Sequence, residues 1–217
     1  ESGRAFWQPA DNFDWFLSYE NFNDQGTGQI PTITGGSSRS AYIQEPGFND
    51  FVIDSFRTRM NYNFDSGITL SYIGGYTDSS RESVWDRSWS PDKYEWGGCV
   101  ECTHEATQHE LQIKNEDSAR LQWMVGYFYF KENNSTHFDI VHPDVDYEGG
   151  NTPNPNLWST YRQPDRGLKS NSIYAQSTYK VTDEFRLSAG LRYTEDERWD
   201  RGGRNIMCPD VKRTENL

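Results

Sequence analysis

The sequence lacks any long apolar run. Nowhere do 18 consecutive apolar residues occur, and the mean hydropathy is −0.94. A transmembrane helix needs about 20 consecutive apolar residues and is therefore excluded. A transmembrane β-barrel is not excluded, because each of its strands needs only about ten residues, half of them polar.

Basic residues and cysteines are also scarce. The 21 Lys and Arg residues against 33 Asp and Glu give a net charge of −12. Because phosphate binding requires a basic surface, this balance excludes nucleic acid as a partner. Three cysteines are too few for a disulfide scaffold. Apolar residues make up only 34% of the 217 residues, yet aromatic residues reach 15%, so the chain folds without one large aliphatic core.

What the sequence does contain is a recurring alternation of apolar and polar residues. In 185–194 every odd position is apolar or aromatic and no even position is. A strand places these two sets on opposite faces, whereas a helix would distribute both around its circumference. Similar segments predict about eight strands, the first of them truncated, at 4–7, 13–20, 52–62, 68–77, 108–114, 121–130, 173–181 and 185–194.

Short and long connections alternate between these segments. The short ones are rich in turn-forming residues and lie at 8–12, 65–67, 115–119 and 182–184. The long ones are polar and cover 23–50, 78–106, 133–169 and the residues after 195. Compact soluble domains rarely contain several such loops, whereas outer-membrane barrels have short periplasmic turns and long extracellular loops. The sequence therefore predicts an all-β fold, an antiparallel transmembrane β-barrel segment.

Aromatic residues are placed as this fold requires. Phe185 and Tyr193 bracket Leu187 and Leu191 on one face, and the steps between them rise roughly 20 Å along a tilted barrel. This height is close to that of the apolar band between the aromatic girdles of such barrels. A soluble β-sandwich with an aromatic core is the alternative that this pattern leaves open.

Several segments together resemble the barrel of TonB-dependent outer-membrane receptors, the active transporters of Gram-negative bacteria. They follow the family's order over most of the chain and cover 3–14, 109–113, 120–132, 172–179 and, most clearly, 185–196.

The resemblance implies a barrel of 22 strands around an N-terminal plug domain, together with a short segment that binds the TonB complex. Neither the plug nor that segment is present in the sequence, so we expect 1–217 to be an incomplete barrel segment of a chain roughly three to four times longer. The resemblance also implies residence in the bacterial outer membrane, contact with its lipid, and active uptake of a scarce extracellular small molecule such as a siderophore, vitamin or oligosaccharide. No catalytic or cofactor-binding motif occurs, so we expect neither an enzyme nor a cofactor.

Two groups of side chains are candidates for contact with a ligand or with the plug. Aromatic residues in the expected loops suit either stacking on a ligand or packing between loops: Trp85, Trp89, Tyr94, Trp96 and Trp158. Polar residues that point inward by strand phase would face the plug, as the resemblance implies, or else a hydrated lumen: Arg57, Arg59, Glu110, Gln112, Lys114 and Arg192.

The cysteine pair Cys99 and Cys102 lies in an expected loop, beside His104. A small disulfide in an oxidising exterior is the favoured interpretation. Zinc is the alternative, but a second pair of this spacing is missing, so we expect no metal site. Cys208 is left to pair with one of these residues or with a cysteine beyond Leu217.

Two other functions stay open at this point. One is a passive, porin-like or structural barrel without a plug, which the presence or absence of an upstream plug domain would decide. The other is a soluble carbohydrate-binding β-sandwich, which would be monomeric without detergent.

Overall fold

A computed structural model describes residues 1–27, 47–87, 96–115, 119–141 and 157–206. None of these residues belongs to a helix long and apolar enough to cross a membrane. The described residues form eight strands: β1 (Ser2–Ala10), β2 (Phe13–Gly26), β3 (Phe48–Asn63), β4 (Ile68–Asp86), β5 (Trp96–Asn115), β6 (Leu121–Val141), β7 (Leu157–Lys180) and β8 (Arg186–Ile206).

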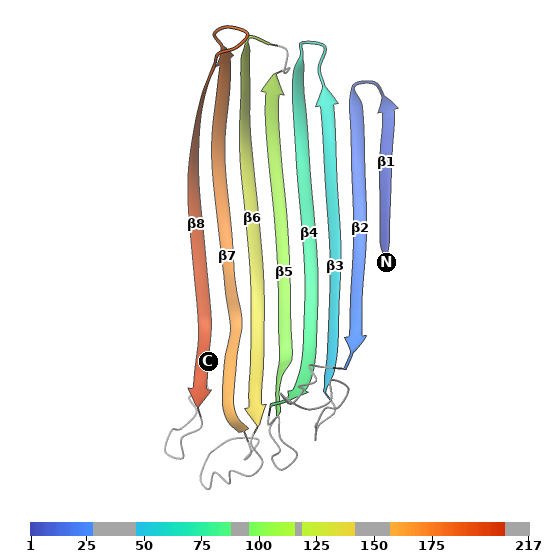
Figure 1. The fold of residues 1–217 in the computed structure, drawn as a ribbon, viewed down its shortest axis with the longest axis vertical. Helices are drawn as coiled ribbons and strands as arrows, with labels where there is room; N and C mark the ends of the chain where they lie inside the picture. Colours follow the sequence, from blue (N-terminus) through green and yellow to red (C-terminus); the bar gives the residue numbers. More distant parts are fainter. Residues whose placement is uncertain (28–46, 88–95, 116–118, 142–156, 207–217) are drawn as a thin grey trace.

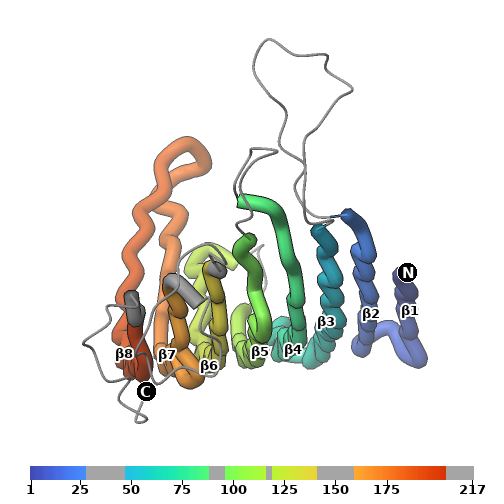
Figure 2. The backbone as a smooth tube through the Cα atoms, turned by 90° about the horizontal axis from the view of Figure 1, so that it is seen from below, coloured from blue at the N-terminus to red at the C-terminus, as the bar shows by residue number. Residues whose placement is uncertain are grey.

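The strands form one antiparallel sheet in which spatial order follows sequence order, from β1 to β8. The short connections lie together at one end of the sheet (Figure 1). Seen along the strands, the sheet is a single layer with β1 and β8 at its two ends (Figure 2). Within the described residues the sheet is open, and no second sheet packs on it as the β-sandwich alternative would require. The predicted class, an antiparallel barrel segment of eight strands, is confirmed.

The cross-strand register extends the alternation over the whole sheet. Leu191 of β8 pairs with Ala175, and this residue with Val125. The same row continues through Ile113 to Leu70 of β4. Since directly paired residues point to the same side, these rows make one face of the sheet apolar. We call this the apolar face, and the opposite one the polar face.

Burial is the reverse of that in a soluble domain. The only buried hydrophobic residues in the described part of the chain are Cys99 and Ile140, whereas Leu191 on the apolar face is 80% exposed. Ser172 on the polar face, in contrast, is only 2% exposed. A single layer that exposes large aliphatic side chains in this way is stable only when an apolar medium covers that face.

Aromatic residues flank the apolar face at two levels. Near the short turns, the Trp7 ring lies edge-on to that of Phe13, with ring centroids 6.2 Å apart. Further along the strands, Tyr19 of β2 pairs with Phe56, which pairs with Tyr76. These two rows correspond to the aromatic girdles of outer-membrane barrels.

The short turns are closed by local hydrogen bonds. Gly67 adopts a φ of 75°, which favours glycine, and its amide donates to the carbonyl of Phe64 (3.0 Å). In the last turn the Thr182 hydroxyl accepts hydrogen bonds from the amides of Glu184 and Phe185. Such turns hold neighbouring strands in a fixed register.

The strands run further than the sequence predicted. β4 has 19 residues and β7 has 24, although a bilayer requires only about 9–11. Parts of all four expected loops are therefore strand: 23–50, 78–106, 133–169 and the residues after 195. For example, β2 continues to Gly26, β5 begins at Trp96 and β8 continues to Ile206. The alternation disappears there because both faces are polar beyond the apolar band. β7 even continues through Pro164, at an irregularity of the register between Arg162 and Asp165, where the missing amide donor is tolerated.

Candidate functional site

The polar face is the candidate site because it gathers the polar and charged side chains of all strands. Cross-strand pairing places the six residues predicted to point inward on this one face: Arg57, Arg59, Glu110, Gln112, Lys114 and Arg192.

A hydrogen-bonded cluster crosses β5, β6 and β7. The Tyr174 hydroxyl of β7 donates to Glu110 of β5, and the Gln112 side chain donates to the same carboxylate oxygen (3.0 Å). Tyr174 reaches that far because its ring lies directly over Gly126 of β6, where a Cβ would clash with it. Gly126 thus leaves room for the Tyr174 ring, and the Tyr174 hydroxyl holds the Glu110 side chain in place.

Arg192 extends this cluster onto β8. Its guanidinium carbon lies 5.4 Å from the ring centroid of Phe128 and 5.8 Å from that of Tyr174. One guanidinium nitrogen donates to the Ser172 hydroxyl (2.9 Å). Two aromatic rings and a hydroxyl therefore fix this cation, which makes it part of the wall's structure.

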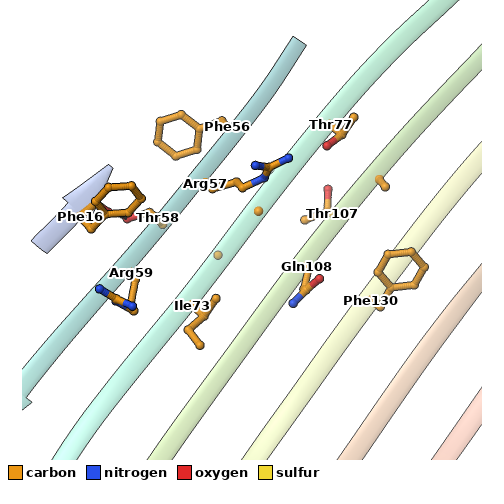
Figure 3. A pocket seen from close by; sticks show the side chains of 13 residues that line it. Phe16, Phe56, Arg57, Thr58, Arg59, Ile73, Thr77, Thr107, Gln108 and Phe130 are labelled. Carbon is orange, nitrogen blue, oxygen red and sulfur yellow. Dashed lines mark hydrogen bonds between the residues drawn. The ribbon is translucent and has the colours of Figure 1, made fainter. Parts of the chain in front are cut away.

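A hollow with a volume of about 490 Å³ lies beside this cluster. It opens over β3, β4 and β5, with Phe16 at one side and Phe130 at the other (Figure 3). Gly75 forms its floor, because a Cβ there would find no heavy atom closer than 3.9 Å. The hollow thus combines two aromatic walls with the guanidinium groups of Arg57 and Arg59.

Two smaller hollows lie on the same face, one on either side of it along the strand direction. The one towards the long loops has a volume of about 460 Å³ and is lined in part by Arg81 and Trp85. The one towards the short turns has a volume of about 310 Å³ and is lined in part by Arg59, Lys114 and Asp14. Arg59 and Ile73 line both this hollow and the central one, so the two hollows adjoin.

The described part of the chain contains the side chains of two of the predicted loop aromatics, and these two lie on opposite faces. Trp85 lies in β4, half-buried, with its ring centroid 5.5 Å from that of Phe138. Trp96 opens β5 and pairs with Asp86, so it points to the opposite face from Trp85. The remaining three lie outside the described residues or have no described side chain: Trp89, Tyr94 and Trp158.

Cys99 and Cys102 are joined by a disulfide within β5, not within a loop. In a regular strand their Cα atoms would be about 10 Å apart, with side chains on opposite faces. A register irregularity between Cys99 and Glu101 brings the Cα atoms to 6.0 Å. Among the described residues, no group of three or more His, Cys, Asp or Glu side chains could hold a metal ion. Cys208 lies outside the described part of the chain.

Sequence reasoning missed the aromatic side chains of the polar face. Phe16, Phe128 and Phe130 interrupt the alternation, and Tyr174 occupies a polar-phase position of its strand. A glycine on the neighbouring strand is a usable signal for such a position, since Gly126 pairs directly with Tyr174. An isolated glycine in a strand often marks a close approach of this kind, but the register is needed to identify its partner.

Comparison with known proteins identifies the class. The family model "TonB dependent receptor-like, beta-barrel" matches residues 2–215. The chain therefore belongs to this family of outer-membrane receptor barrels. No curated protein matches the chain significantly.

A solved structure shares the fold. It is the crystal structure of the ferric yersiniabactin uptake receptor FyuA from Yersinia pestis, which matches with a TM-score of 0.71 at 11% sequence identity. The match covers 94% of this chain and 32% of that receptor, so the chain spans about a third of its length. At this identity the likeness shows the fold alone.

Proposed function

We propose that the chain forms part of the wall of a bacterial outer-membrane receptor that actively takes up a scarce extracellular nutrient. The observation that carries the proposal is the division of one open sheet into an apolar face between two aromatic rows and a polar, hollowed face. Lipid contacts the first face, and the lumen lies against the second. Family membership supports this function, because the family consists of receptor barrels and not of enzymes.

The rest of the uptake machinery is proposed on the same ground. A plug domain of the same protein fills the lumen and contacts the polar face, and energy arrives through the TonB complex. The ligand is a small molecule that enters from the side of the long loops. There it meets the hollow beside Trp85, where the Arg81 side chain donates to Asn49 (3.0 Å) and Asn49 donates to Asp24 (3.1 Å). A tryptophan ring beside hydrogen-bonding side chains suits a ligand with both apolar and polar surface.

Fractionation of cells that express the whole protein tests the proposed location. We expect the receptor in the outer-membrane fraction, and we expect its unheated form to migrate differently from its boiled form in SDS gels. Nutrient-limited growth through the receptor should stop when the TonB complex is deleted. Growth that continues without TonB would point to a passive pore, and a detergent-free soluble monomer would refute the membrane assignment altogether.

A further inference from the structure

Arg57 and Arg59 both line the central hollow, and no acidic residue is among the residues that line it. Across the strands, Arg57 is paired with Ser18 and Gly75. Arg59 is paired with Phe16 and with Ile73 of the neighbouring strands. The described residues include no ion pair to either guanidinium group, although Arg198 and Arg201 of β8 each have an aspartate partner.

Three carboxylates of the polar face lie nearest in register, and among the described residues none forms an ion pair with either arginine. Glu20 pairs with Ser55, one polar-face position along β2 from the partner of Arg57, and its side chain is exposed. Glu110 lies beyond Ile73 and accepts hydrogen bonds from Tyr174 and Gln112. Asp14, near the short turns, accepts from the Asn61 side chain (2.9 Å). The two arginines therefore present their charge to the hollow and not to the wall.

The hollow beside them has room for a ligand with an apolar body. The open floor at Gly75 lies between Arg57 on β3 and Gln108 on β5, which pair with it from the two sides. Phe16, Ile73 and Phe130 supply apolar surface around this floor (Figure 3). Guanidinium groups match the geometry of a carboxylate or similar oxyanion, and aromatic rings match a flat apolar group.

We propose that the hollow over Gly75 binds an organic anion, with its oxyanion group at Arg57 and Arg59 and its apolar body against the aromatic walls. This inference rests on the proposed function and gives the chemical class of the transported ligand. The two neighbouring hollows each contain a carboxylate beside their cation, Asp24 with Arg81 and Asp14 with Lys114, whereas the central hollow contains none. Because opposite charges on the ligand and the protein attract each other in this site, its affinity depends on salt.

The test uses the full-length receptor in lipid nanodiscs and two probes that differ in charge, 2-naphthoate and the neutral 2-naphthamide. Titration calorimetry should show tighter binding of 2-naphthoate. Arg57→Gln with Arg59→Gln should weaken 2-naphthoate binding about tenfold or more and leave 2-naphthamide within about twofold. Gly75→Leu should weaken both probes, because the leucine fills the hollow.

A matched control removes two charges from the same face of a distant strand. Arg186→Gln with Arg198→Gln changes the net charge equally on β8 and should leave both affinities within about twofold. Arg57→Lys with Arg59→Lys keeps the charge but not the paired donor geometry, and it should give an intermediate affinity for 2-naphthoate. This variant also serves if the double glutamine protein does not insert.

Three results would overturn the proposal: no binding of 2-naphthoate by the wild-type receptor, equal affinities for the two probes, or no effect of the arginine substitutions. Each is compatible with correct insertion and TonB-dependent growth, so failure of this inference is distinguishable from failure of the proposed function. Failure of the proposed function would appear in the membrane fractionation and in growth without TonB.

Discussion

At the scale of single residues, the polar face is organised by glycines as much as by charges. Gly126 allows the Tyr174 ring to lie flat on β6 and reach Glu110, whereas Gly75 leaves open space. The two positions look alike in sequence, since each is a glycine in the polar phase of a strand. What separates them is the residue opposite, a tyrosine in one case and Gln108 in the other.

Gly126→Ala should destabilise the folded barrel by about 1–3 kcal/mol, because the new methyl group displaces the Tyr174 ring and breaks its hydrogen bond to Glu110. Urea unfolding of the receptor in vesicles measures this change. Gly190→Ala is the matched control, since a Cβ there meets its nearest atom at 3.5 Å. In a Tyr174→Ala background, Gly126→Ala should lower the free energy of unfolding only slightly. An equally large loss of stability in that background would disprove that Gly126 is needed to make room for the Tyr174 ring.

The disulfide gives a second prediction at this scale. In a Cys208→Ser receptor, a maleimide should label neither Cys99 nor Cys102 before reduction and both after it. The reason is the register irregularity, which brings the two Cα atoms within disulfide range. Labelling of either thiol on the native, unreduced protein would show that the bond does not form.

At the scale of elements, the sequence predicts the strands best where one face of the strand is apolar and the other is polar. β8 shows this clearly. Its alternating apolar residues, from Leu187 through Leu191 to Tyr193, all pair with residues of the apolar face of β7. Beyond the aromatic rows no such contrast exists, so the sequence pattern indicates loops where the outer halves of β4 to β8 lie. The Trp85 and Trp96 candidates fell in those halves, and only the register shows that they occupy opposite faces.

The same contrast predicts how β7 and β8 respond to a new charge. Leu191→Arg should destabilise the barrel by about 2–4 kcal/mol, because it places a cation in the apolar band. Gln176→Arg, which lies on the polar face of the adjacent strand, should have little effect. Refolding into lipid vesicles at graded urea concentrations compares the two, and equal costs would contradict the assignment of the faces.

At the scale of the whole molecule, the open sheet has two edges. Within the described residues, β1 pairs only with β2, and β8 only with β7. An unpaired row of backbone amides and carbonyls in lipid costs several kcal/mol per group, so membrane barrels close. Eight strands could close a small barrel, but the 490 Å³ hollow and the open floor at Gly75 suit a wider one with separate contents.

We therefore predict that β1 and β8 each pair with a further strand in the native receptor, as part of a protein roughly three to four times longer than this chain. Hydrogen exchange of the receptor in nanodiscs tests the pairing directly. Along Arg186–Tyr193 of β8, every backbone amide should exchange slowly, both those that donate to β7 and the alternate ones that point away from it. Intact mass measures the length independently. Fast exchange at alternate residues of β8, or a folded membrane-embedded species of the mass of this chain alone, 25.2 kDa, would show that the sheet ends where β8 does.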